Sequence, residues 1–181
     1  QMCIRDRYGG TRSLIEKYFN NYGIEYSFTK GLLVSDFESE IKKNTKAIYI
    51  ETPSNPLLKI VDIFEIANLS KSNGLVSFID NTFATPLIQK PHKLGIDIVI
   101  HSATKYLGGH SDILAGSVSG KSSYIDKIKN SGLNFGANIS EYSAWLLERS
   151  IKTLSPRVNS QNNNALQIAK FFTSNNKVEK V

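Results

Sequence analysis

Residues 97–112 read DIVIHSATKYLGGHSD, and this stretch decides the fold. Its first part is an apolar run, which predicts a buried strand over 97–102. The strand ends in the polar residues Ser102, Thr104 and Lys105, which are followed by a pair of glycines. Polar side chains directly after a buried strand are typical of a ligand site at the end of a parallel sheet.

Strands and helices alternate along the rest of the chain. Further strands are predicted at 24–28, 46–51, 76–79 and 115–120. Helices are predicted over 12–21, 36–43 (capped by Ser35), 62–73, 122–130, 139–154 and 159–174. Because the strands are almost continuously apolar, they indicate an α/β fold with an open, mostly parallel sheet and helices on both faces. The first seven residues, QMCIRDR, show neither periodicity, so no strand is predicted there.

Three of the predicted strands end in residues that can carry chemistry. Asn55 and Asp80 follow two of them, and Ser102, Thr104 and Lys105 follow the third. Right-handed crossovers place the three ends on one edge of the sheet. Taken singly, Asp80 also fits a turn cap, Asn55 a turn residue between prolines, and Lys105 a solvated loop lysine.

Together, this set suits pyridoxal phosphate. A lysine amine forms a Schiff base with the cofactor aldehyde, and a carboxylate keeps the ring nitrogen protonated. Hydroxyls and backbone N–H groups hold the phosphate. A glycine pair after the lysine allows close approach of the backbone.

Composition narrows the function classes. The chain has 181 residues, 22 Lys+Arg and 16 Asp+Glu, for a net charge of +6, and it is 40% hydrophobic. That composition is ordinary for a globular protein and excludes a disordered tail. No apolar run approaches the roughly 18 residues of a membrane span. The single cysteine, Cys3, favours a reducing compartment, so we expect a cytoplasmic protein that binds no membrane.

Two other ligand classes are disfavoured. The lysines are scattered among acidic residues, and no run of five like charges occurs, which argues against a nucleic-acid partner. The histidines at 92, 101 and 110 lack carboxylates or thiols at ligand spacing, so no metal site is expected. We interpret them as core or turn histidines.

Four more motifs accompany the stretch at 97–112. They are YGGT (8–11), ETPSNPLLKIVDI (51–63), DNTFATP (80–86) and LLERSIKTLSPR (146–157). With these motifs the chain resembles the Cys/Met metabolism, or trans-sulfuration, family of pyridoxal-phosphate enzymes, in the branch of cystathionine γ-synthase and γ-lyase. The resemblance implies the large cofactor-binding domain of the aspartate-aminotransferase-like (fold-type I) enzymes.

The resemblance also implies a role for each matching residue. Lys105 is similar in position to the Schiff-base lysine, which also moves protons. Asp80 matches the carboxylate on the ring nitrogen, and Ser102 and Thr104 match the phosphate-binding hydroxyls. Tyr8 matches the tyrosine that stacks on the ring and transfers protons. Asn55, finally, matches the asparagine near the cofactor's 3-hydroxyl and the substrate carboxylate.

At the level of the whole protein, the resemblance implies γ-replacement or γ-elimination on sulfur amino acids or activated homoserine esters. The alternatives are methionine γ-lyase activity and O-acetylhomoserine sulfhydrylase activity. Gly10 disfavours the first, because methionine γ-lyases commonly have cysteine at this position. A catalytically inactive structural homologue is an alternative of a different class. The expected partners are a small amino-acid substrate and further copies of the chain, as a dimer of dimers.

The domain expectation is a fragment. Residues 8–181 match part of the cofactor-binding domain, and residues 1–7 match poorly, which predicts a truncated or foreign start. The family's N-terminal segment and C-terminal small domain are expected to be missing. We therefore expect the fragment alone to be inactive, and interpret Arg149 and Arg157 as structural or interdomain residues.

Overall fold

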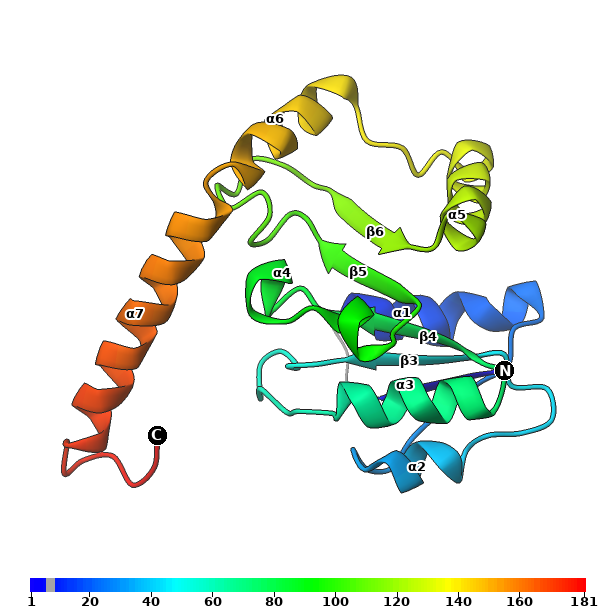
Figure 1. Cartoon of the computed structure of the whole chain (residues 1–181), viewed down its shortest axis with the longest axis horizontal. Coiled ribbons are helices and arrows are strands. Elements are labelled where there is room, and N and C mark those ends of the chain that lie inside the picture. The colour runs from blue at the N-terminus through cyan, green and yellow to red at the C-terminus, as the bar shows by residue number, and fades with distance from the viewer. Residues whose placement is uncertain (6–8) are drawn as a thin grey trace.

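A computed structural model describes residues 1–5 and 9–181 of the chain (Figure 1). Six strands form one sheet: β1 (Met2–Arg5), β2 (Tyr26–Phe28), β3 (Ala47–Glu51), β4 (Val76–Asp80), β5 (Ile98–Ser102) and β6 (Gly116–Gly120). Their order is β2-β1-β3-β4-β5-β6. All neighbours are parallel except β5 and β6, which are antiparallel. The predicted mostly parallel α/β fold is therefore confirmed.

All the helices except the short one at Thr85–Ile88, which was not predicted, occupy the predicted places with shifted ends. They are α1 (Gly9–Tyr18), α2 (Val34–Glu38), α3 (Ile63–Ser72), α4 (Thr85–Ile88), α5 (Ser122–Phe135), α6 (Glu141–Ile151) and α7 (Leu154–Thr173), with 3-10 turns at Phe19–Tyr22 and Pro91–Leu94. The predicted cap at Ser35 is wrong, because α2 already begins at Val34. The Asp36 carboxylate accepts a hydrogen bond from the Leu33 backbone N–H at 2.9 Å, which fixes that start.

The absence of a strand in the first seven residues was also a wrong expectation. Strand β1 pairs with β2 on one side and β3 on the other, in register Met2 to Tyr26 and Met2 to Ala47. A four-residue strand between two neighbours is specified by this pairing rather than by its own pattern. Local periodicity therefore could not reveal it.

Helices cover both faces of the sheet (Figure 1). The larger core joins α2 and α3 to β3 and β4, where Phe37, Ile48, Ile50 and Ile79 are fully buried. On the opposite face, Ile15 of α1 packs in a smaller cluster. Burial of such side chains supplies the main driving force for folding. This packing fixes the strands, and with them the edge where the functional residues lie.

A third cluster ties the C-terminal helices to the segment after β5. Ala103 and Leu107 of that segment are buried against Leu154 and Val158 of α7. Beyond Val158, most of α7 is exposed, and the helix runs away from the sheet (Figure 1). The first turns of α7 therefore support the lysine-bearing loop.

Candidate functional site

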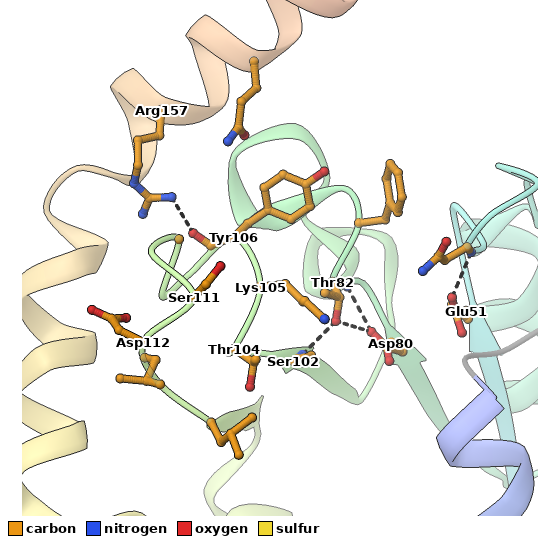
Figure 2. A pocket seen from close by; sticks show the side chains of 16 residues that line it. Glu51, Asp80, Thr82, Ser102, Thr104, Lys105, Tyr106, Ser111, Asp112 and Arg157 are labelled. Atoms are coloured by element: carbon orange, nitrogen blue, oxygen red, sulfur yellow. Dashed lines mark hydrogen bonds between the residues drawn. The ribbon is translucent and has the colours of Figure 1, made fainter.

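The carboxyl ends of β3, β4 and β5 meet at one edge of the sheet, as predicted. Glu51 at the end of β3 is paired with Asp80 at the end of β4, and Asp80 with Ile100 of β5. A cavity of about 920 Å³ opens at this edge (Figure 2). It is lined by Glu51, Asn55, Asp80, Thr82, Phe83, Ser102, Thr104, Lys105, Tyr106, Gly109, Ser111, Asp112, Ile113, Leu114, Arg157 and Gln161. Five of the six predicted site residues thus share one cavity.

Tyr8, the sixth predicted residue, lies outside the described residues. Its assignment therefore stays a prediction from the resemblance. Within the described part of the chain, no group of three or more His, Cys, Asp or Glu residues could hold a metal ion.

A short hydrogen-bond chain joins the ends of β4 and β5. The Asp80 carboxylate accepts from the backbone N–H of Thr82 at 3.0 Å and from the Thr82 hydroxyl at 2.5 Å, both on Oδ1. The Thr82 hydroxyl in turn accepts from the backbone N–H of Ser102 at 2.7 Å. The carboxylate is therefore held in a fixed orientation at the cavity wall (Figure 2).

Lys105 lies on a tight turn directly after β5. Its backbone N–H donates to the Ser102 carbonyl at 3.0 Å, and the Lys105 carbonyl accepts from the Gly109 N–H at 2.6 Å. The Lys105 side chain is exposed to the cavity and points toward the Thr82 and Asp80 pair (Figure 2). Close approach requires glycine at 108, since a Cβ there would lie 2.8 Å from the Ala103 carbonyl oxygen. The turn therefore presents an amine to the carboxylate side of the cavity.

Arg157 of α7 binds the backbone of the segment that follows Lys105. Its guanidinium donates to the carbonyls of Tyr106 at 2.7 Å, Leu107 at 3.4 Å and Ser150 at 3.0 Å. The predicted structural role of Arg157 fits these contacts. The arginine also lines the cavity, which was not predicted.

Thr104 is bonded to the backbone of Ala115, just before β6. Its hydroxyl accepts from the Ala115 N–H at 2.9 Å and donates to the Ala115 carbonyl at 3.2 Å. The same carbonyl also accepts from the Thr104 backbone N–H at 3.0 Å. The hydroxyl proton can therefore turn toward a phosphate without leaving that carbonyl unpaired.

Asn55 lies at the rim of the cavity and is exposed. Its backbone N–H donates at 3.1 Å to Glu51, a carboxylate only 6% exposed. Sequence reasoning missed Glu51 because it reads as the last residue of an apolar strand. The buried carboxylate fixes the turn that carries the asparagine.

One titratable group beside the site is perturbed. His101 on β5 is buried, and desolvation lowers the pKa of its imidazole, while the charge of Asp80 opposes this by raising it. The net pKa is below the ordinary value, so the ring favours its neutral form. This agrees with the prediction of a core histidine.

The residues present suit pyridoxal phosphate. An amine, a fixed carboxylate and hydroxyls converge on one cavity, and these are the groups that the aldehyde, ring nitrogen and phosphate require. Thr82 is the further polar residue that sequence reasoning missed. Its position two residues after Asp80 was a usable signal, because Asp and Thr at this spacing commonly form a turn stabilised by the Asp side chain. Within the part of the chain described, no helix has the length and apolar character to cross a membrane.

Known proteins resemble the chain closely. A cystathionine beta-lyase of Lactococcus lactis subsp. cremoris is 46% identical over 180 residues, covering 97% of this chain and 47% of the relative. A cystathionine gamma-lyase of Bacillus subtilis (strain 168) is 44% identical over 178 residues, covering 96% of this chain and 46% of the relative. The solved structure of cystathionine gamma-lyase from Lactobacillus plantarum complexed with L-serine matches with a TM-score of 0.92 at 42% identity. The match covers 97% of this chain and 47% of the solved chain.

The chain thus spans about half the length of these relatives. The family model for "Cys/Met metabolism PLP-dependent enzyme" matches residues 1–181. The chain therefore belongs to the Cys/Met metabolism family of pyridoxal-phosphate-dependent enzymes.

Proposed function

We propose that the full-length protein is a trans-sulfuration enzyme of the cystathionine γ-synthase or γ-lyase type. It would act on sulfur amino acids or activated homoserine esters, with Lys105 bonded to the cofactor. The observation that supports this most directly is the convergence of Lys105, Asp80 and Ser102 on one cavity at the ends of β4 and β5. We also expect the full-length protein to assemble as a dimer of dimers.

Pyridoxal phosphate, when bound, supplies an aldehyde that bonds to amines and an electron-poor ring that stores the charge left by a broken Cα–H bond. Lys105 would hold the cofactor through that aldehyde. The Lys105 amine would also take the Cα proton of the substrate and return protons later in the reaction.

The other residues bind and orient. Asp80 would hold the proton of the ring nitrogen, and Ser102 and Thr104 would donate to the phosphate. Asn55 would bind near the 3-hydroxyl and the substrate carboxylate. From the resemblance, Tyr8 would stack on the ring and assist proton transfer. The Ala115 carbonyl accepts from the Thr104 backbone N–H as well as from the Thr104 hydroxyl, so the hydroxyl can leave it. This supports the assignment of the Thr104 hydroxyl to the phosphate.

A β-elimination is a second candidate reaction. It is favoured by relatives of 46% and 42% identity that are named cystathionine beta-lyase. The β and γ reactions differ in which carbon–sulfur bond of cystathionine breaks, so their products differ.

The lysine assignment is tested by chemical trapping. The full-length protein is loaded with pyridoxal phosphate and treated with borohydride, which fixes the link between amine and cofactor, and the labelled peptide is identified by mass spectrometry. We expect the label on Lys105 and its loss in Lys105→Ala. The control is Lys121→Ala, which changes an exposed lysine that does not line the cavity. A label that persists in Lys105→Ala would refute the assignment.

The reaction is tested by product analysis of the same protein. Cystathionine gives cysteine, 2-oxobutyrate and ammonia by γ-elimination, but homocysteine, pyruvate and ammonia by β-elimination. Formation of cystathionine from an O-acylhomoserine and cysteine indicates γ-replacement. Pyruvate as the only 2-oxo acid, with no γ-replacement, would overturn the γ proposal in favour of the second candidate.

A further inference from the structure

Thr82 occupies a special position between two of the proposed cofactor residues. The Ser102 backbone N–H can only donate, so the Thr82 oxygen must accept from it at 2.7 Å. The Asp80 carboxylate can only accept, so the single Thr82 hydroxyl proton goes to Oδ1 at 2.5 Å. The direction of the whole chain is therefore fixed, from Ser102 through Thr82 to Asp80.

The hydroxyl does more than complete a turn. The turn after β4 needs only the backbone N–H of Thr82, which any residue other than proline would supply at 3.0 Å from Oδ1. The β4 and β5 backbones are last joined where the Asn81 N–H donates to the Ile100 carbonyl at 2.9 Å. The next donor on β5 that turns toward β4 is the Ser102 N–H, and the Thr82 hydroxyl takes the place of a backbone carbonyl for it.

The carboxylate is thereby oriented by one of its oxygens. Among the described residues, both bonds to Asp80 end on Oδ1, which leaves Oδ2 to receive a proton donor from the cavity. Bonds to an ionised oxygen are about twice as strong as neutral ones, and linked bonds strengthen one another. Movement of Ser102 is therefore coupled to the orientation of Asp80.

We propose that Thr82 is a positioning residue whose hydroxyl aims the Asp80 carboxylate at the cofactor ring nitrogen and locks it to the phosphate-binding end of β5. The inference rests on the proposed function, since it takes Asp80 as the partner of the ring nitrogen. It predicts that the hydroxyl acts through Asp80 and not through the general stability of the fold.

The test measures the affinity of the full-length apoprotein for pyridoxal phosphate, followed by cofactor absorbance. Thr82→Val keeps the branched shape and removes the hydroxyl, whereas Thr82→Ser keeps the hydroxyl and serves as the matched control. We expect Thr82→Val to raise the dissociation constant about 10-fold and Thr82→Ser to change it less than about 3-fold. An unchanged dissociation constant in Thr82→Val would overturn the proposal.

A double-mutant cycle separates positioning from a loss of folding. In an Asp80→Asn background, we expect Thr82→Val to change the dissociation constant by less than about 3-fold, because the group it orients has lost its charge. An equal loss in both backgrounds would show a structural role and refute the inference.

A second measurement needs no cofactor. Hydrogen exchange of the Ser102 amide in the apoprotein should accelerate in Thr82→Val and stay near wild type in Thr82→Ser. Unchanged exchange in Thr82→Val would overturn the link to Ser102. Failure of the proposed function has a separate signature, namely a wild-type protein with no cofactor trapped on Lys105.

Discussion

Gly109 allows Arg157 to approach the turn that carries Lys105, because it has no Cβ to fill the space that the guanidinium occupies. Its φ of +77° lies in the left-handed region, and a Cβ at this position would overlap the guanidinium of Arg157. Gly109→Ala must therefore both strain the backbone and push the arginine away from the carbonyls of Tyr106 and Leu107. We expect this single methyl group to destabilise the protein through two separable effects.

The magnitude follows from those two effects. An alanine in the left-handed region costs about 1 kcal/mol. The bond from Arg157 to the Tyr106 carbonyl, at 2.7 Å, is worth about 1.5 kcal/mol, and the bond to Leu107, at 3.4 Å, adds only about 0.5 kcal/mol. Gly109→Ala should therefore lower the free energy of unfolding by about 3 kcal/mol.

Gly136 provides the matched control. It ends α5 with a φ of +75°, but a Cβ there would meet no atom within 4 Å. Gly136→Ala should therefore cost only the backbone contribution, about 1 kcal/mol. In an Arg157→Ala background, Gly109→Ala should likewise cost about 1 kcal/mol, because the overlap is gone.

The assay is equilibrium urea unfolding of the full-length apoprotein, followed by far-ultraviolet circular dichroism. If Gly109→Ala and Gly136→Ala cost the same, the methyl group does not displace the guanidinium. If Gly109→Ala costs as much without Arg157 as with it, the coupling between turn and helix does not exist. Either result refutes the reasoning.

Three further predictions concern stability and use the same urea measurement on the full-length apoprotein. Ile79→Ala, at a fully buried position in β4, should cost about 3 kcal/mol, and a cost under about 1 kcal/mol would contradict its place in the core. Asp62→Ala removes the carboxylate that accepts from the Glu65 N–H at the start of α3, so it should cost about 1 kcal/mol, whereas Asp62→Asn should be nearly neutral. Burial lowers the pKa of His101, and the charge of Asp80 opposes this with a smaller effect. The unfolded state therefore binds a proton more readily than the folded state does. The stability that the neutral His101 contributes is full above the unfolded pKa of about 6.5 and is lost as the pH falls below it. The difference in stability between wild type and His101→Gln should therefore shrink from pH 7.5 to pH 5, and a constant difference would contradict the lowered pKa.

The strand ends were predictable because a buried parallel strand has a strong local signature. An apolar run such as residues 97–102 can only be satisfied in the interior, and the polar residues that stop it mark the edge. The convergence of Asp80 and Lys105 followed from topology alone, since parallel strands point the same way. The cofactor class followed from the chemical types of these residues.

The parts that sequence reasoning missed depend on contacts between distant segments. Strand β1 forms because two neighbours pair with it, and its own residues carry no period. The antiparallel direction of β6 reflects a chain reversal after Lys105 that no local pattern records. In the sequence Thr82 looks like an ordinary turn residue. Its role depends on the backbone N–H of Ser102, which lies 20 positions away and donates to the Thr82 hydroxyl at 2.7 Å.

The residues with proposed chemical roles are held in place by others that have none. Arg157 reaches the Tyr106 carbonyl across 51 positions of sequence, and Ala115 holds the Thr104 hydroxyl because β6 returns antiparallel beside β5, with Gly116 opposite Ser102. A substitution that shifts β6 would therefore move the Thr104 hydroxyl, which we propose as a phosphate ligand, without contacting it. Because β6 is paired with β5 over its whole length, substitutions in β6 should alter cofactor affinity more than equally exposed substitutions late in α7.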